Sequence, residues 1–276
     1  MTAGSPSSDP LLADLREAYL GEDLLLFAGA GVSAAAGLPS WRRLVELLFD
    51  RARARNVAAP TLQEIADLLA GEQLIDALSA LKSALGPDDF GAAVERLLDD
   101  KGHDVPAVAR AIASLAPCLR GVLTTSLDRL VERAFKGAWP ALTRVTGPVL
   151  RRRHYILELH GTLFERASWA FTPDDADRAM FADPQLQTAF YAVFHGAPLL
   201  FVGYGLADAD FDQVLSRVRV FAGGQPPRRF ALVAEETVTP DRKALMDESG
   251  VEIIRYANPD GTHGEAARIL DWLAGS

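Results

Sequence analysis

The chain has 276 residues, a formal net charge of −9 and a single cysteine. Its length suits one large domain rather than two full ones, and its 49% apolar content provides for a sizeable core. One cysteine excludes an internal disulfide framework and a cysteine-rich zinc ribbon, and it is typical of a protein of the reducing cytoplasm. Acidic residues outnumber basic ones 37 to 28, which argues against broad binding to nucleic acid.

Residues 1–10 are rich in Ser, Pro and Gly and predict a disordered N-terminus without the basic and apolar regions of a secretory signal. No apolar run approaches the ~20 residues that a membrane span needs. We therefore expect a cytoplasmic protein without a membrane partner, folded over residues 11–276.

The first half of the chain predicts mainly helices. Helical spacing of apolar residues from Leu11 to Tyr19 indicates a short helix, and the apolar run 24–28 indicates a buried strand. An amphipathic pattern over 41–55 indicates a second helix. From 61 to 119 only helical stripes follow, broken at Gly71, Gly86-Pro87 and Gly102, so we expect a helical insertion at about 60–119.

Strand-like runs then return, and most of them are apolar on both faces. They occur at 121–125, 142–145, 155–159, 198–202, 230–234 and 251–256. Helical patterns at 127–136, 184–194, 210–220, 240–248 and 264–273 lie between or after them. This alternation predicts an α/β fold with a doubly wound, mainly parallel sheet that is covered on both sides.

A glycine loop follows the first predicted strand. Gly29, Gly31 and Ala34 fit the pattern G-x-G-x-x-A between a strand and a helix, where glycines let the backbone approach a pyrophosphate. The alternative is a tight turn whose small residues serve packing alone. An ordinary dehydrogenase fits poorly, because the acid at the ribose-binding spacing, Asp50, lies within a predicted helix.

Polar residues also follow three later strands. Ser126 and Asp128 follow the strand at 121–125, where they could contact a ligand or cap the next helix. His160 ends another strand and precedes a glycine, so it could act as a general base or be a structural histidine bonded to a carbonyl. Gly203 and Gly205 allow close backbone approach after the strand at 198–202, and we expect Asp208 or Asp210 to cap the helix that follows.

Together, the segments 27–33, 37–41, 124–128, 160–161 and 200–204 resemble the SIR2-like, sirtuin-related superfamily, in particular its bacterial branch of anti-phage NADases. Their order is the family's order, and the similarity runs from about residue 20 to the C-terminus. The resemblance implies a Rossmann-like, SIR2-like domain that takes NAD⁺ as its substrate. The histidines show no metal-binding spacing, so we expect no metal.

The resemblance also implies roles for individual residues. Gly29, Ala30, Gly31 and Ser33 would cradle the pyrophosphate, Pro39, Trp41 and Arg42 would cover the cofactor, Thr124 would contact it, and Gly203 and Tyr204 would lie near the adenosine-side ribose. Asp128 would hold the nicotinamide amide, and His160 matches the catalytic histidine. Ser126 stands where the family usually has Asn, and it would position the attacking water or a ribose hydroxyl.

The expected activity is hydrolysis of NAD⁺ to nicotinamide and ADP-ribose by a defence effector that depletes NAD⁺ in abortive infection. Two alternatives remain: a catalytically weak or inactive NAD⁺- or ADP-ribose-binding regulatory module, which the Ser126 departure favours, and a protein deacylase, which the missing zinc cysteines disfavour. The helical insertion could gate the site, bind a regulator or simply cap the sheet. Control would come from a homo-oligomer or a separately encoded regulator, for which the family suggests an Argonaute-like protein or a HerA-type ATPase.

Overall fold

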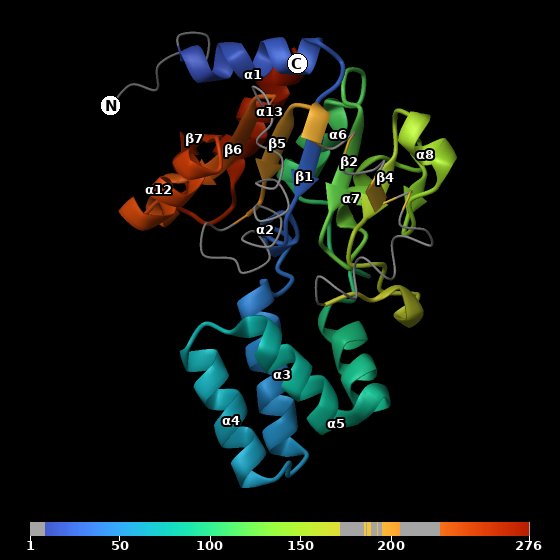
Figure 1. The fold of residues 1–276 in the computed structure, drawn as a ribbon, viewed down its shortest axis with the longest axis vertical. Coiled ribbons are helices and arrows are strands. Elements are labelled where there is room, and N and C mark those ends of the chain that lie inside the picture. Colours follow the sequence, from blue (N-terminus) through green and yellow to red (C-terminus); the bar gives the residue numbers. More distant parts are fainter. Residues whose placement is uncertain are drawn as a thin grey trace.

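The computed structural model of the chain describes residues 9–171, 185, 187–188, 192, 195–204 and 227–275. Its centre is a seven-stranded sheet of order β3-β4-β2-β1-β5-β6-β7, in which every neighbouring pair is parallel (Figure 1). The strands are β1 (Leu25–Ala28), β2 (Gly121–Thr124), β3 (Ala141–Leu142), β4 (Ile156–Glu158), β5 (Leu199–Val202), β6 (Arg229–Ala234) and β7 (Val251–Tyr256). The predicted α/β fold with a parallel sheet is confirmed.

One strand prediction was wrong in extent. The strand expected over 142–145 is only the two-residue β3, which overlaps that range at Leu142. The chain bends at residues 143–144, directly after β3, and α8 (Gly147–Arg151) begins soon after with a proline in its first turn. Val145 is nevertheless buried in the core, which explains the apolar pattern that suggested a longer strand.

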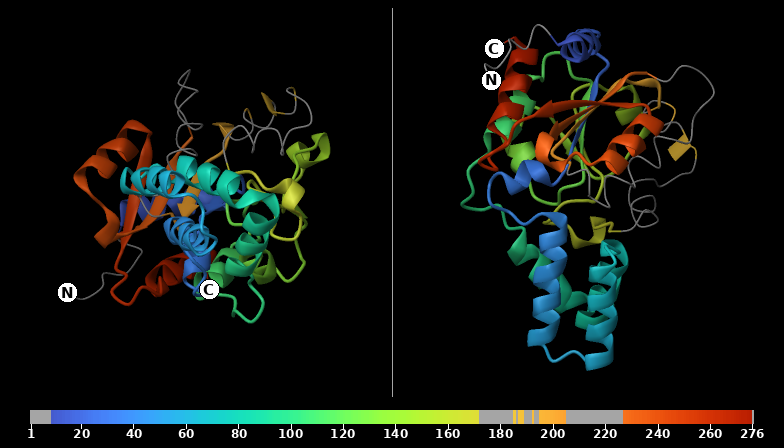
Figure 2. Two further views of the ribbon diagram at one scale, coloured as in Figure 1. Left: turned by 90° about the horizontal axis from the view of Figure 1, so that it is seen from below. Right: turned by 90° about the vertical axis from the view of Figure 1, so that its left-hand side faces the viewer.

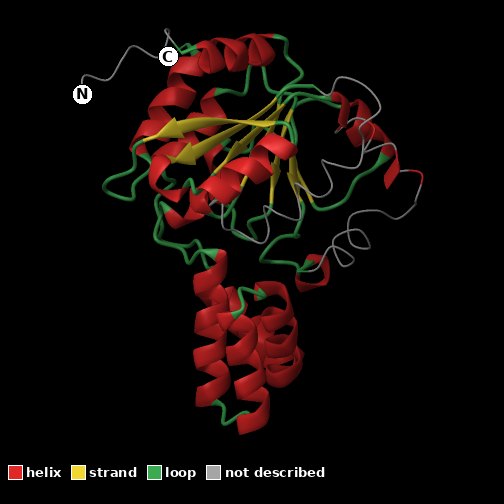
Figure 3. Cartoon of the chain, turned by 60° about the vertical axis from the view of Figure 1, so that its left-hand side comes forward, coloured by secondary structure: helices red, strands yellow, loops and turns green. Residues whose placement is uncertain are grey.

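Helices cover both faces of the sheet, as Figure 3 shows. One face packs against α1 (Pro10–Leu20), α6 (Ala107–Ser114), α7 (Leu130–Ala134) and α13 (Gly264–Ala274). The other face packs against α8 and α12 (Pro240–Glu248). Alternate residues of β1 enter the two cores, with Leu26 on the first face and Leu25 and Phe27 on the second.

Three further helices form a separate layer below the carboxyl ends of the central strands (Figure 2). We call α3 (Trp41–Ala54), α4 (Ala59–Ala70) and α5 (Leu74–Leu97) the helical module. They enclose their own apolar core, which includes Leu48, Ile65 and Leu78. The module thus begins at Trp41, ahead of the predicted insertion, whereas α6 packs against the sheet with α7 and α13.

One predicted break and one shortened helix have clear causes. At Gly86 the backbone has φ 74° and ψ 162° and Pro87 follows, so α5 is kinked where the sequence indicated a break. After β2, the helix expected over 127–136 is only the five-residue α7 (Leu130–Ala134), because residues 127–129 form a bend before it.

The chain termini and the later helices are described in part. Asp9 caps α1 by accepting a hydrogen bond from the amide of Leu11, so residues 9 and 10 of the predicted N-terminal tail belong to a capped helix. The helix predicted over 184–194 lies largely outside the described residues, and the one over 210–220 lies entirely outside them, as do Gly205, Asp208 and Asp210. Among the helices that are described, none is both long and apolar enough to cross a membrane.

Candidate functional site

Four neighbouring strands end at the edge of the sheet that faces the helical module (Figure 2). Ala28 is level with Thr124 of β2 and with Val202 of β5, and Thr124 is level with Glu158 of β4. The parallel topology therefore brings together the polar segments that follow β1, β2, β4 and β5. This is the edge at which ligands bind in open α/β sheets.

The glycine loop after β1 packs directly against the loop after β5. The amide of Gly31 donates to the carbonyl of Gly203 at 2.8 Å. A Cβ on Gly31 would lie 2.6 Å from that carbonyl oxygen, and a Cβ on Gly29 would lie 2.8 Å from the ring of Tyr204. These glycines are therefore required for packing between the two loops, whether or not the loop also binds a pyrophosphate.

Four amides of the glycine loop, those of Gly29, Gly31, Val32 and Ser33, already have acceptors within the protein. Gly29 donates to Val202, Val32 donates to Gly29, and the amide of Ser33 donates to Ala30. A phosphate that contacted these groups would have to share their hydrogens. The pyrophosphate role of Gly29, Ala30, Gly31 and Ser33 remains a prediction.

Tyr204 joins the loops after β5 and β2. Its side chain is buried, its hydroxyl lies 3.3 Å from Oγ1 of Thr125, and its ring packs edge-on against Phe201. Oγ1 of the neighbouring Thr124 is also used within the protein, because it accepts the amide of Ser126 at 3.1 Å. Thr124 and Tyr204 thus stabilise the loops at this edge of the sheet.

Ser126 and Asp128 are held by the residue between them. Leu127 is buried in the core of the helical module, whereas Ser126 and Asp128 are buried at the sheet edge. The possibility that Ser126 caps α7 is wrong, because Arg129 occupies the N-cap position and makes no side-chain capping bond. Asp128 instead accepts the amide of Leu130 at 3.0 Å.

Two buried hydroxyls near Asp128 lack a hydrogen-bond partner within the described part of the chain. They are Oγ of Ser33 and Oγ of Ser126. Because an unsatisfied buried hydroxyl costs about 1–3 kcal/mol, such groups call for a bound polar partner. Both can donate or accept, so they suit the hydroxyl and amide groups of a nucleotide.

The electrostatics around Asp128 favour its neutral form. Burial raises the pKa of Asp128, the nearby Ser33 hydroxyl and the amide of Leu130 oppose that rise, and Asp100 adds to it. Ser33 is thus close enough to favour the charged carboxylate, although it lacks hydrogen-bonding geometry. A ligand with an amide or cationic group would stabilise the charged form of Asp128 further.

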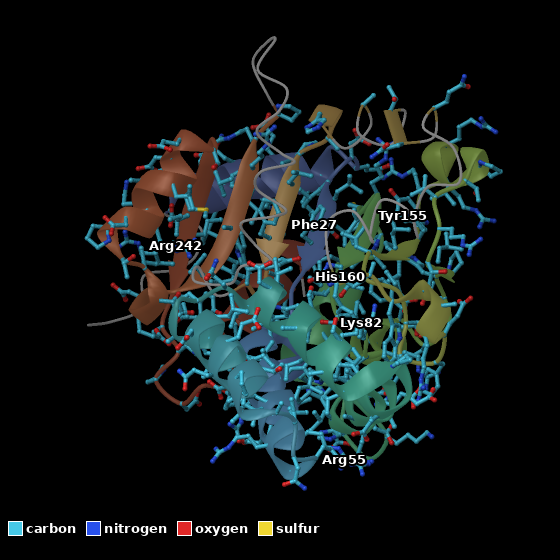
Figure 4. The ribbon with its side chains drawn as sticks, turned by 60° about the horizontal axis from the view of Figure 1, so that its bottom comes forward. Phe27, Arg55, Lys82, Tyr155, His160 and Arg242 are labelled. Carbon is cyan, nitrogen blue, oxygen red and sulfur yellow. The ribbon has the colours of Figure 1, made fainter. Side chains whose placement is uncertain are left out.

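His160 lies at the end of β4 and faces the helical module. Figure 4 shows it at the border between the sheet, which carries Phe27, and α5, which carries Lys82. The His160 side chain is buried, and its ring centroid lies 6.1 Å from that of Trp41. Its carbonyl accepts the amide of Ala170, which folds the following loop back over the strand end.

The predicted cofactor-covering residues lie where the chain enters the helical module. Trp41 begins α3 and bridges His160 and Phe171, with ring centroids 6.1 Å from each. Pro39 is half-buried just ahead of it. Arg42 makes ion pairs with Glu46 and Glu72 of the module, so contact between Arg42 and a cofactor would require these pairs to open.

Sequence reasoning missed Glu158, a buried carboxyl group on β4. Burial raises its pKa to about 7; Glu132 and Asp128 add to the rise and Arg129 opposes it. The signal was present in the sequence, since Glu158 is the only charged residue between Tyr155 and Leu159. Within the described ranges, no group of three or more His, Cys, Asp and Glu side chains is arranged to hold a metal ion.

Comparisons with known proteins agree with this architecture. The family model for the SIR2-like domain matches residues 120–254. NAD(+) hydrolase ThsA of Bacillus cereus (strain MSX-D12) is 22% identical over 244 residues, which are 86% of this chain and 48% of that protein. NAD(+) hydrolase ThsA of Cytobacillus dafuensis is 25% identical over 261 residues, which are 92% of this chain and 49% of that protein.

The chain therefore spans about half the length of these curated relatives. A solved structure described as "Structural Basis for the Mechanism and Regulation of Sir2 Enzymes" matches with a TM-score of 0.53 and 15% identity, covering 97% of this chain and 98% of its own. At that identity the likeness concerns the fold alone: this chain and that structure share a Rossmann-like α/β fold.

Proposed function

We propose that this chain, which resembles SIR2-like proteins over residues 120–254, hydrolyses NAD⁺ to nicotinamide and ADP-ribose. The observation that carries the proposal is the pair of buried, unsatisfied hydroxyls of Ser33 and Ser126 beside the carboxyl group of Asp128. The similarity to two proteins named NAD(+) hydrolase supports the same activity.

In this reaction, water adds across the bond between ribose C1′ and the nicotinamide nitrogen. The C1′–N bond breaks, the electron pair leaves with neutral nicotinamide, and one proton is released when water becomes the new C1′ hydroxyl. The transition state carries positive charge on the ribose, so a catalyst must orient the leaving group and stabilise that charge.

The residues at the sheet edge suit these tasks. We assign the nicotinamide amide to Asp128, whose carboxylate can accept its N–H groups. We assign His160 as the general base that takes a proton from the water or from a ribose hydroxyl. Ser126 would position that water or hydroxyl through its otherwise unsatisfied Oγ. The two buried carboxyl groups, of Asp128 and Glu158, would favour positive charge on the ribose when ionised.

We extend the proposal to the role of this activity in the cell. An enzyme that consumes NAD⁺ without an acceptor other than water would deplete the cellular pool, which suits a cytoplasmic defence effector. Such an activity needs restraint by an oligomeric state or by a separately encoded regulator. The resemblance to anti-phage NADases supports this role, and an Argonaute-like protein or a HerA-type ATPase would fit as the regulator.

A second candidate function rests on Ser126, which occupies the position where the SIR2-like family that this chain resembles usually has asparagine. A serine offers one hydroxyl in place of the paired donor and acceptor of an amide. The chain would then bind NAD⁺ or ADP-ribose and regulate a partner without turning the nucleotide over.

Release of nicotinamide from NAD⁺ by the purified protein separates these two functions. We expect release together with ADP-ribose, and we expect His160→Ala to lower kcat by at least about 10²-fold while the protein still binds ADP-ribose. Binding without release would establish the regulatory module instead. A Ser126→Asn variant that gained turnover would identify the serine as the limiting residue, and an unchanged rate in His160→Ala would remove His160 from its role.

A further inference from the structure

A chain of polar contacts connects α7 to the turn that follows the glycine loop. It starts at Arg133 of α7, which donates from Nη1 to the carbonyl of Asp100 at 2.8 Å and pairs with its carboxylate at 3.0 Å. Nη2 of the same side chain donates to the carbonyl of His103 at 2.8 Å. Asp100 is only 1% exposed, so a single guanidinium fixes both ends of the turn 100–103.

His103 links the turn 100–103 to the segment that follows the glycine loop. Its Nδ1 lies 2.7 Å from the carbonyl oxygen of Ala36. Because a carbonyl can only accept, Nδ1 must carry the hydrogen, as it does in one neutral tautomer and in the imidazolium. Gly37 follows with φ +89°, and a Cβ there would lie 3.9 Å from the ring of His103, so the ring packs along this turn.

The turn that His103 holds leads directly to predicted site residues. The carbonyl of Ser33 accepts the amides of Ala36 at 2.9 Å and of Leu38 at 3.3 Å. Ala36 therefore sits between Ser33, whose hydroxyl lies near Asp128, and the segment 39–41, which contains Trp41. A hydrogen bond to Ala36 therefore restrains both Ser33 and the segment 39–41.

The connection runs from one side of the candidate site to the other. Asp128 lies two residues before the start of α7, α7 carries Arg133, and the contacts through Asp100, His103 and Ala36 lead to the turn that contains Ser33. The two sides of the candidate nicotinamide site are thus joined by side chains that the predicted site did not include.

We propose that His103 is a positioning residue for NAD⁺: its Nδ1–H bond to Ala36 holds the turn 33–38 against α7 and thereby sets Ser33 and the covering segment 39–41 for nucleotide binding. The substrate in this inference rests on the proposed function. The tether itself does not, since it is a property of the folded chain.

Two variants of His103 separate positioning from general stability. His103→Ala removes the donor, whereas His103→Asn keeps a donor at the same number of bonds from Cβ as Nδ1. Asp104→Ala is the matched control, because the neighbouring Asp104 is exposed and its side chain makes no hydrogen bond or ion pair within the described structure. We expect His103→Ala to raise the KM for NAD⁺ about fivefold or more, with kcat changed less than about twofold, and Asn to restore KM.

Hydrogen exchange of the peptide that contains residues 34–38 tests the tether without any substrate. We expect faster exchange in His103→Ala than in the parent, His103→Asn or Asp104→Ala. Unchanged exchange in His103→Ala would overturn the tether. Faster exchange with an unchanged KM, or a fall in kcat alone, would overturn its role in positioning.

The two proposals fail in different ways. If the parent protein releases no nicotinamide, the affinity for ADP-ribose, measured by calorimetry, replaces KM as the readout for the same variants. If the parent neither cleaves NAD⁺ nor binds ADP-ribose, the proposed function and the nucleotide part of this inference both fail, while exchange still decides whether the tether exists.

Discussion

Glu158 places a carboxyl group on a strand whose other residues are apolar. It is 5% exposed and lies level with Thr124 of the neighbouring strand. Burial raises its pKa to about 7 from the usual 4.5. Between these two pH values the folded state retains a proton that the unfolded chain has released, so stability falls as pH rises through this window.

A Glu158→Gln variant tests this linkage, because glutamine keeps the shape and cannot ionise. At pH 8 we expect the variant to exceed the parent in free energy of unfolding by roughly 1–3 kcal/mol, since the parent then buries a charge. The difference should shrink as the pH falls through this window and be nearly gone at about pH 4, where the unfolded chain keeps the proton as well. Urea unfolding at both pH values measures it.

The exposed Glu165 provides the control for this experiment. Glu165→Gln changes the net charge equally and should leave the free energy of unfolding within about 0.5 kcal/mol of the parent at either pH. A gain in Glu158→Gln that was equal at both pH values would contradict the linkage, because it would come from packing rather than from titration.

The sequence predicted the role of a residue only where its side chain and its neighbours along the chain gave a signal. His160, Ser126 and Asp128 stood out because polar residues followed apolar strands. His103 gave no such signal, since its partner Ala36 is 67 positions away and only the folded chain brings them together. The missing partner of Ser126 Oγ is likewise a property of packing, which no local pattern encodes.

At the level of elements, the contact between the loops after β1 and β5 depends on Gly203. It has φ +75°, and a Cβ there would lie 2.7 Å from both the amide nitrogen and a methyl group of Val32. Gly137 has nearly the same φ, +76°, but nothing lies within 4 Å of an added Cβ. Alanine variants of these two glycines therefore distinguish the free-energy cost of backbone strain from the cost of disturbed loop packing.

We expect both Gly203→Ala and Gly137→Ala to lose about 1–2 kcal/mol through the left-handed backbone. Gly203→Ala should lose roughly 1–3 kcal/mol more, because the added methyl overpacks the glycine loop. Chemical denaturation of the two variants measures the difference. Equal losses would show that the loops can separate without cost.

The elements themselves were largely predictable because their apolar patterns are long and regular. β1 and β5 are short runs buried on both faces, and α3 has a clear amphipathic stripe. β3 was overestimated because Val145 is buried without being in a strand. α2 (Gly31–Ala34) is a single turn, too short to leave a periodic pattern of its own.

At the scale of the molecule, the candidate site lies where the helical module joins the sheet. The core of the module includes side chains from two site loops, Leu127 after β2 and Leu163 after β4. The Arg166 guanidinium also pairs with Glu95 of α5 at 2.6 Å. The sequence indicated a helical insertion, but not that the site loops contribute to its core, because that contact joins segments far apart in the chain.

This shared core predicts that the packing of the module controls the geometry of the site. Leu127→Ala and Leu78→Ala each remove a buried leucine from the same core, and each should cost roughly 2–5 kcal/mol in the free energy of unfolding. Only Leu127 lies between Ser126 and Asp128, so only Leu127→Ala should lower kcat, by about tenfold or more, at a temperature where circular dichroism shows both variants folded. Where NAD⁺ is bound but not cleaved, the affinity for ADP-ribose is compared instead. Equal effects of the two variants on the site would mean that the module supports the fold without positioning Ser126 and Asp128.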